Sequence, residues 1–271
     1  MLDVRLFKQS TFAVPAFVLT LGTFVTWGLL FLLPQFLQLV DGRSALWVGM
    51  VVSVISITWC VSATTISIVI RRVGERAVLG AGILLTAVGT ACFLQLDRTA
   101  STVWVVVGLC IIGLGMGTAT TPATSMLVSD LPPEKAGVGS AMNDVTREFG
   151  TAFGVAALGT IVAFRYSARL LDVTAALPAG DADSARNNLS DALDVGRRVG
   201  GARGEQLADA ARSAFTSGLT VAVGVSVVLL VALALIVFTC LPHSRRVRFR
   251  HPWGSPIARP AVTVEGQTAE P

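Results

Sequence analysis

Residues 215–241 read FTSGLTVAVGVSVVLLVALALIVFTCL, a run of 27 residues without Asp, Glu, Lys or Arg. A helix needs about 20 mostly apolar residues to cross the roughly 30 Å hydrocarbon core of a bilayer. The alternating segments of about ten residues that are typical of membrane β-barrels are not seen in this sequence. A helix is the other structure that satisfies its own backbone in lipid, so the run predicts a transmembrane helix.

Five more apolar runs precede this stretch; short polar or charged segments separate them from one another, and residues 165–214 separate the fifth from this stretch. The 271-residue chain is 53% hydrophobic and only 14% charged, and its mean hydropathy is +0.70. Soluble domains carry about 25% charged residues, so this chain has too few charges to cover a water-soluble surface. We therefore expect an all-α membrane protein with six transmembrane helices. Their expected bounds are Val14–Val40, Leu46–Ile70, Ala77–Leu96, Thr102–Val128, Val138–Phe164 and Phe215–Leu241.

Basic residues in the short connections predict the orientation, because Lys and Arg accumulate on the cytoplasmic side. One side carries eleven such residues, whereas the other carries only Arg43 and Arg98. We expect the richer side, and with it both termini, to be cytoplasmic. The eleven residues are Arg5, Lys8, Arg71, Arg72, Arg76, Lys135, Arg245, Arg246, Arg248, Arg250 and Arg259.

Three segments lie outside the apolar runs. We expect residues 1–13 to form a cytoplasmic N-terminal segment and residues 165–214 to form a long external loop. The seven Arg and seven acidic residues of that loop nearly cancel, which suits a solvated surface. Residues 242–271 form a basic tail with several prolines, which we expect to be disordered and to favour anionic lipid where it leaves the membrane.

A charged cluster stands out at the start of the fifth run. Asp144, Arg147 and Glu148 are spaced i, i+3 and i+4, so they share one helix face. The uncharged residues 149–164 span about 24 Å as a helix, which places Arg147 and Glu148 several ångströms inside a core of about 30 Å. Charges at that depth usually face a partner or a water-filled path. Arg147 and Glu148 either form a structural pair or extend to the cytoplasmic interface; the alternative is a gating or proton-coupling site made by Asn143, Asp144, Arg147 and Glu148.

Uncharged polar and aromatic residues inside the runs are candidate substrate contacts. Trp27 lies in the middle of the first run, and Gln35 and Gln38 lie near its outer end. Thr118 and Thr121 lie in the fourth run. The alternative is packing, because Thr hydroxyls often bond to their own helix backbone. The same default applies to the second run, which is rich in Ser and Thr.

Several glycines and histidines bear on the excluded functions. Gly113 to Gly117 superficially resembles a nucleotide loop, but it lies in mid-helix and fits small-xxx-small helix packing instead, as do Gly150 and Gly154. His243 and His251, the only histidines, lie in the tail, which argues against a His-based enzyme or metal site in the membrane. We expect no cofactor, no metal and no nucleic-acid partner.

Two stretches have a familiar pattern. Residues 131–150 read LPPEKAGVGSAMNDVTREFG, and residues 32–38 read LLPQFLQ after an N-terminal LDVRLF. Together they resemble the major facilitator superfamily and, more narrowly, the fourteen-helix drug:proton antiporters of bacteria. The resemblance extends to about Leu241 and includes the long external loop.

The connection after the second run resembles the family's loop motif, G-x-x-x-D-[RK]-x-G-[RK]-[RK]. Arg72, Gly74 and Arg76 match it. The Asp-based latch of the motif is not preserved. The departures are Ser67, Arg71 and Glu75.

The resemblance implies the C-terminal half of a transporter built from two six-helix bundles around a cavity. Its first and fourth helices would line the cavity, its second and fifth would meet the other half, and its third and sixth would face lipid. It further implies multidrug efflux coupled to protons in a bacterial plasma membrane, by a fragment or split subunit that needs the missing N-terminal half or a partner subunit; a homodimer is the other arrangement. The alternatives are a non-transporting scaffold or regulatory subunit and, less favoured, a membrane enzyme.

Overall fold

The computed structural model describes residues 10–96, 102–129, 136–175 and 177–241, and all regular elements in these ranges are helical. Six helices in this part of the chain are long and apolar enough to cross a membrane, which confirms the expected all-α, six-helix fold. The elements are α1 (Ser10–Gln35), the π-helix η2 (Phe36–Val40), α2 (Ala45–Val73), α3 (Glu75–Ala91), the 3-10 helix η3 (Cys92–Gln95), α4 (Thr102–Ser129), α5 (Ala136–Thr174), α6 (Ala179–Asn187), α7 (Leu189–Val199) and α8 (Gly201–Cys240).

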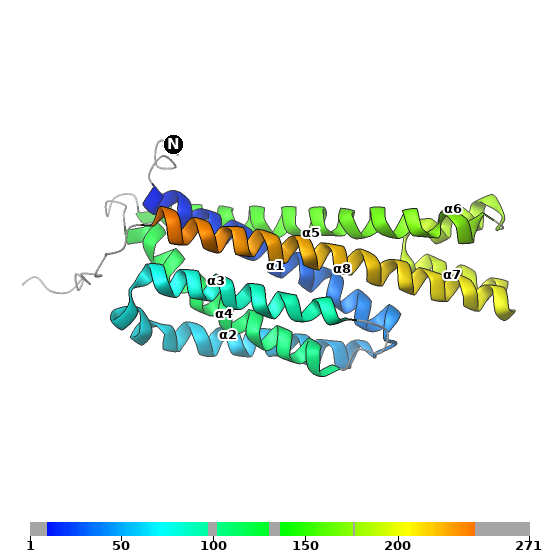
Figure 1. The fold of residues 1–271 in the computed structure, drawn as a ribbon, viewed down its shortest axis with the longest axis horizontal. Helices are drawn as coiled ribbons and strands as arrows, with labels where there is room; N and C mark the ends of the chain where they lie inside the picture. Colours follow the sequence, from blue (N-terminus) through cyan, green and yellow to red (C-terminus); the bar gives the residue numbers. More distant parts are fainter. Residues whose placement is uncertain (1–9, 97–101, 130–135, 176, 242–271) are drawn as a thin grey trace, which may run out of the picture.

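The long helices form two layers (Figure 1). In one layer α1 packs against α5 and α4, and α4 packs against α2, which gives the order α5, α1, α4, α2. In the other layer α8 and α3 pack against each other, with α8 also on α5 and α3 on α4. Thus α1 and α4 are central, α2 and α5 flank them, and α3 and α8 lie behind.

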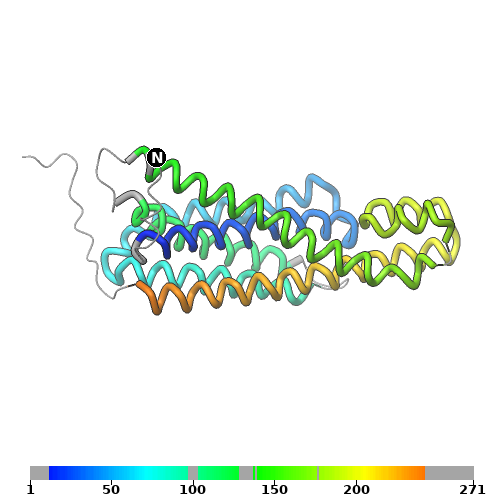
Figure 2. The backbone as a smooth tube through the Cα atoms, turned by 90° about the horizontal axis from the view of Figure 1, so that it is seen from above, coloured from blue at the N-terminus to red at the C-terminus, as the bar shows by residue number. Residues whose placement is uncertain are grey.

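The two ends of the bundle differ. The beginning of α1, the α2–α3 turn at Gly74 and the last residue of α8, Cys240, lie at one end, which we call the terminal end (Figure 1). At the other end, which we call the hairpin end, α6, α7 and the adjoining parts of α5 and α8 project past the remaining helices (Figure 2). The expected basic tail and residues 1–9 of the expected N-terminal segment lie outside the described residues.

Residues 165–214, expected to form a loop, are largely helical. Helix α5 continues to Thr174, and α8 begins at Gly201, well before its charge-free run. With 40 residues α8 is about 60 Å long, roughly twice the thickness of a hydrocarbon core. We call α6, α7 and the adjoining parts of α5 and α8 the hairpin unit.

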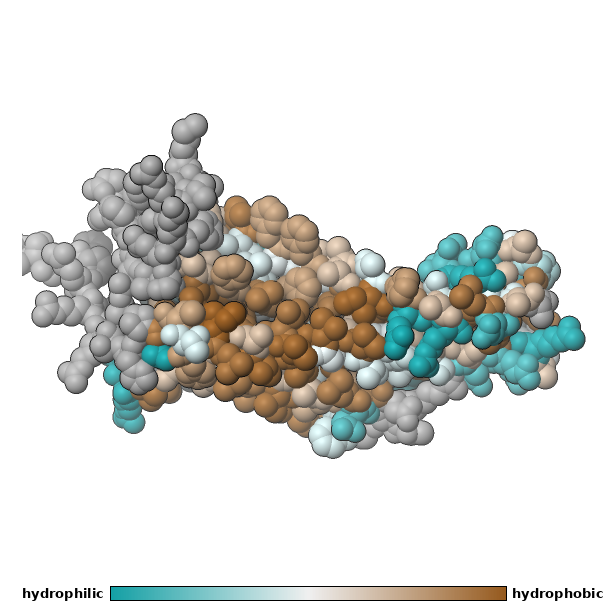
Figure 3. Space-filling view, turned by 45° about the horizontal axis from the view of Figure 1, so that its top comes forward, coloured by the Kyte–Doolittle hydropathy of each residue, from teal (hydrophilic) through white to brown (hydrophobic). Residues whose placement is uncertain are grey.

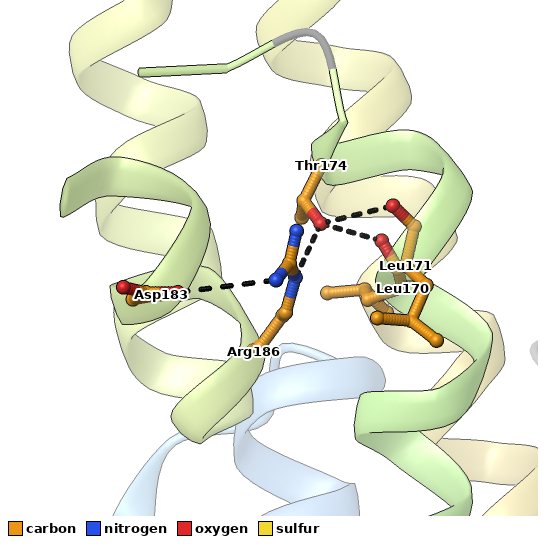
Figure 4. Close-up of polar contacts among 5 residues, drawn as sticks. All are labelled: Leu170, Leu171, Thr174, Asp183 and Arg186. Atoms are coloured by element: carbon orange, nitrogen blue, oxygen red, sulfur yellow. Dashed lines mark hydrogen bonds and ion pairs between the residues drawn. The ribbon is translucent and has the colours of Figure 1, made fainter. Parts of the chain in front are cut away.

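Buried polar contacts fix the hairpin unit. The Tyr166 hydroxyl on α5 donates to Ala185 O at 2.8 Å and lies 3.1 Å from Asn188 O, in a side chain that is 2% exposed. Arg186 Nε donates to Thr174 Oγ1 at 2.7 Å, while Nη1 of the same guanidinium lies 3.8 Å from Asp183 (Figure 4). The segment is therefore a docked helical unit rather than a loop.

On the face drawn in Figure 3, apolar residues cover most of the middle of the bundle, and hydrophilic residues predominate on the hairpin unit beyond it. This division suits a membrane-spanning part and a part that faces water. It is what the charge-free runs of the sequence require, because charged groups are costly in hydrocarbon.

Candidate functional site

Hydroxyl groups line one side of α2. Four hydroxyl residues and one cysteine recur there at spacings of three and four, and all are exposed, so they form a polar stripe. The stripe consists of Ser53, Ser56, Cys60, Thr64 and Ser67. Two of these hydroxyls bond to their own helix backbone, as expected: Ser53 Oγ donates to Met50 O at 2.7 Å, and Thr64 Oγ1 donates to Cys60 O at 3.1 Å. The bonding lowers the cost of facing an apolar medium without making the stripe apolar.

The exposed sides of α3 and α8 carry no such groups in their middle parts. Leu84 and Val88 are exposed on α3, and Val228, Leu235 and Ile236 on α8. Residues 77–96 and 215–241 contain no charged side chain. These two helices therefore present an apolar surface that suits lipid, whereas on α2 the polar stripe lies beside exposed apolar side chains such as Ile57 and Val61.

Glycines bring α1 and α5 into direct backbone contact. A methyl group at Gly28 would lie 2.8 Å from Gly154 O, and one at Gly154 would overlap Phe24 O. Thr23 Oγ1 on α1 lies 3.3 Å from Arg147 O on α5. Gly150 of α5 packs against the same turn of α1, next to Thr23. The predicted packing role of Gly150 and Gly154 therefore holds, with α1 as their partner.

The glycines of α4 are divided between two neighbours. A methyl group at Gly117 would lie 2.6 Å from Trp59 O of α2, and Gly113 also faces α2. Gly115 faces α3 instead, where a methyl group would lie 2.7 Å from Gly82 O. The run that superficially resembles a nucleotide loop thus lets one helix approach two others closely.

The predicted charged cluster lies on α5 towards the terminal end. Asp144 and Glu148 are exposed, and Arg147 is partly buried. Asn143 links the helices, because its Oδ1 accepts from Thr124 Oγ1 of α4 at 3.1 Å and its Nδ2 donates to Asp144 Oδ1 at 3.3 Å. Among the described residues no ion pair joins Arg147 to either carboxylate. The fold therefore brings Asn143 and Asp144 together and leaves both acids accessible.

The substrate candidates on α1 differ in accessibility. Trp27 is 43% exposed and Gln38 is exposed. Gln35 is engaged with its own helix, since its Nε2 donates to Phe31 O at 3.0 Å. Trp27 and Gln38 are thus accessible to a bound molecule, whereas Gln35 Nε2 must first break its hydrogen bond to Phe31 O.

The candidates on α4 take part in helix contacts. Thr118 Oγ1 lies 2.8 Å from Ser62 Oγ of α2, and both groups lie within 2.9 Å of Leu114 O. Thr121 Oγ1 donates to Gly117 O at 3.0 Å in its own helix. Both threonines are partly buried. Thr118 therefore ties α2 to α4, in addition to any contact with substrate.

The exposed aromatic rings on α5 were not among the site residues predicted from the sequence. Phe149 and Phe153 are 57% and 61% exposed, and their rings stack with centroids 5.9 Å apart. Phe31 of α1 lies beside Gly159 of α5. The i, i+4 spacing of the two phenylalanines next to the charged cluster was the available signal.

The loop-motif residues hold the terminal end together. Gly74 ends α2 with φ +92°, a conformation that L side chains rarely adopt. Arg76 donates to Phe238 O in the last turn of α8, where carbonyls lack helix partners, and the Phe238 ring lies against Gly80. Arg72 is exposed. Gly74 thus serves the α2–α3 turn, and Arg76 serves the contact of α3 with α8.

No group of three or more His, Cys, Asp or Glu side chains that could hold a metal ion occurs within the described ranges. The polar stripe of α2 and the candidate residues on α1, α4 and α5 include hydroxyls, amides and the carboxylates of Asp144 and Glu148, which can bind organic molecules and exchange protons.

Comparison with known proteins identifies the family of the chain. Residues 3–155 match the family model of the Major Facilitator Superfamily. The chain belongs to this superfamily. Similar members include "Multidrug efflux pump LfrA" of Mycolicibacterium smegmatis, 28% identical over 88% of this chain, and "Methyl viologen resistance protein SmvA" of Salmonella typhimurium, 25% identical over 91%. The "Tetracenomycin C resistance and export protein" of Streptomyces glaucescens is 28% identical over 88%.

The matched part covers 47%, 50% and 46% of these three superfamily members, respectively. The chain therefore spans about half the length of the curated relatives it matches.

Proposed function

We propose that this chain is the C-terminal half of a proton-coupled secondary transporter that exports small hydrophobic or cationic molecules by alternating access. One observation carries the proposal. The exposed polar stripe of α2 and the exposed carboxylates of α5 lie on helices long and apolar enough to cross a membrane. Polar groups in hydrocarbon are costly unless protein or water covers them, and a second bundle with a cavity between the halves supplies both.

The substrate class is supported by the chemistry of α1 and α5. Trp27, Phe31 and the stacked pair Phe149 and Phe153 are exposed aromatic surfaces. Such rings bind apolar molecules, and their faces attract organic cations. The names of these relatives, which concern multidrug efflux, methyl viologen resistance and tetracenomycin C export, agree with a substrate of this kind.

The partner would cover the exposed sides of α2 and α5 and would be an N-terminal bundle, either in the same polypeptide or as a separate subunit. The terminal end, which carries Arg71 and Arg72 next to α3, would be cytoplasmic in a bacterial plasma membrane, and the hairpin unit would be external. Protons would enter and leave through Asp144 and Glu148.

Expression in a pump-deficient strain tests the proposal. The 271-residue chain alone should reach the membrane and give no export of a fluorescent planar cation such as ethidium. Purified from the membranes of its own host, it should be recovered within a longer polypeptide or with a partner that supplies further transmembrane helices. Robust proton-dependent export by the chain alone would overturn the half-transporter proposal, and recovery with a partner that gives no export of any test compound would favour a scaffold.

A further inference from the structure

The outer end of α1 is an unusual piece of helix. Pro34 lacks a backbone N–H, and the helix widens into the π-helix η2 immediately after it. Asp41 N donates to Phe36 O at 3.1 Å and Arg43 N to Leu37 O at 2.9 Å, spans of five and six residues. π-helical turns are rare and less regular than α-helix, so this end of α1 needs support from outside the helix.

Part of that support comes from α8, which packs against η2. Arg212 Nε donates to Leu39 O at 3.4 Å, although the two residues are 173 positions apart in the chain. Leu39 lies in the last turn, where carbonyl oxygens have no regular helix partner. Arg212 Nη1 also lies 3.5 Å from Asp209 one turn earlier, and the Arg212 side chain is only 36% exposed. The guanidinium is therefore held between α8 and the end of α1.

Arg212 belongs to the part of α8 that carries the hairpin unit. Gly204, two turns before it, is in backbone contact with Gly196 of α7, and Tyr166 fixes α6 to α5. A continuous series of contacts thus leads from the hairpin unit through α8 and Arg212 to the end of α1. Helix α1 bears Trp27, and η2 at its end bears Gln38.

We propose that Arg212 is a positioning residue that fixes the outer end of α1 to the hairpin unit, so that both move as one body when the outer mouth of the cavity opens and closes. The role in opening rests on the proposed function; the mechanical link does not. Arg suits this task because its planar fork can bond to a carbonyl and a carboxylate at once.

Hydrogen–deuterium exchange on the full 271-residue chain in detergent tests the link without any transport assay. In Arg212→Ala, amides of residues 36–44 should exchange roughly tenfold faster, while those in the middle of α1 stay unchanged, because local opening is governed by local contacts. Arg203→Ala is the matched control, since it removes an exposed arginine from the same helix. Unchanged exchange at residues 36–44, or an equal increase in every helix, would overturn the proposal.

A double-mutant cycle tests whether the hairpin unit is part of the same body. Tyr166→Phe should speed exchange in residues 179–199 and also, more weakly, in residues 36–44. The effect on residues 36–44 should disappear when Arg212 is already alanine, since coupled sites are non-additive. Additive effects would contradict the single-body arrangement.

The functional readout uses the transporter reassembled from this chain and the N-terminal bundle proposed above. Arg212→Ala should lower the maximal export rate about fivefold and leave the substrate KM within about twofold, because the cavity side chains are untouched. An unchanged rate despite faster exchange would overturn the role in opening and keep the link. Absence of export in the unsubstituted protein would instead count against the proposed function, and the exchange result would stand independently.

Discussion

The exposed sides of α2 and α8 both belong to long apolar helices, yet they carry different side chains. On α2 the stripe from Ser53 to Ser67 is lined with hydroxyls, whereas on α8 the exposed residues between Val225 and Ile236 are Val, Leu, Ile and Ala. Overall hydropathy does not separate the two helices, because each is long and apolar enough to span a bilayer. The position of the polar groups around the helix is what separates a surface for protein or water from a surface for lipid.

The largest expected effect concerns the contact that holds the flanking helix α5 in place. In Gly154→Ala the new methyl group would overlap Phe24 O of α1, and two helix backbones would have to separate. Overpacking of this kind usually costs 1–3 kcal/mol and sometimes more, and we expect about 3 kcal/mol because the obstacle is backbone. Thermal unfolding of the purified chain in detergent measures the loss.

Gly224→Ala on α8 is the matched control. No atom lies within 4 Å of a methyl group built there. Since alanine favours a helix over glycine by about 0.5–1 kcal/mol, this variant should be as stable as the original or more so. Equal destabilisation by the two substitutions would mean that α1 and α5 are not packed as closely as the structure shows.

The second prediction tests whether the exposed sides of α2 and α8 face different surroundings. Val228→Asn places an amide on the exposed side of α8, where lipid offers no hydrogen-bond partner, and should cost about 1–3 kcal/mol. Cys60→Asn places the same amide in the polar stripe of α2, between Ser56 and Thr64, and should change stability by less than about 0.5 kcal/mol. The thermal midpoints of the reassembled transporter in lipid nanodiscs give the comparison. A penalty at Cys60 as large as that at Val228 would show that α2 faces lipid.

Sequence reasoning predicted the parts of this comparison that depend on composition and spacing. Charge-free runs predicted the long apolar helices, and glycine spacing predicted close packing by Gly113, Gly117, Gly150 and Gly154. The spacing could not show that Gly115, between two of them, faces α3 rather than α2. The direction in which each glycine faces depends on how the helices cross, and a local pattern does not contain that information.

The hairpin unit and the Arg212 contact were beyond prediction for related reasons. The balanced charges of residues 165–214 suited a solvated loop, but they also suit short helices whose charges pair with neighbours, as Arg198 pairs with Asp181 at 3.1 Å. Tyr166 and Thr174 gain their partners only when α6 folds back on α5. The bond from Arg212 to Leu39 O joins opposite ends of the chain and involves a backbone group, so no side-chain motif marks it.

The smallest expected effect concerns the two carboxylates near the start of α5. Asp144 and Glu148 are exposed at the start of a helix whose next sixteen residues are uncharged, and a role in proton coupling requires them to gain and lose protons. Asp144→Asn and Glu148→Gln should each lower proton-driven export about tenfold, equivalent to about 1.4 kcal/mol, while substrate exchange without a proton gradient continues. Vesicle assays of the reassembled transporter with and without an imposed pH gradient separate the two activities.

Asp194→Asn is the control, because Asp194 is exposed and pairs only with neighbouring Arg197 among the described residues. If export driven by the gradient survives both α5 substitutions, the two acids are structural, and the polar character of α5 reflects contact with the other half rather than coupling. If gradient-free exchange is lost together with driven export, the substitutions disturb packing around Asn143 and Thr124, which bond at 3.1 Å beside Asp144. Only the selective loss of driven export supports proton coupling by these carboxylates.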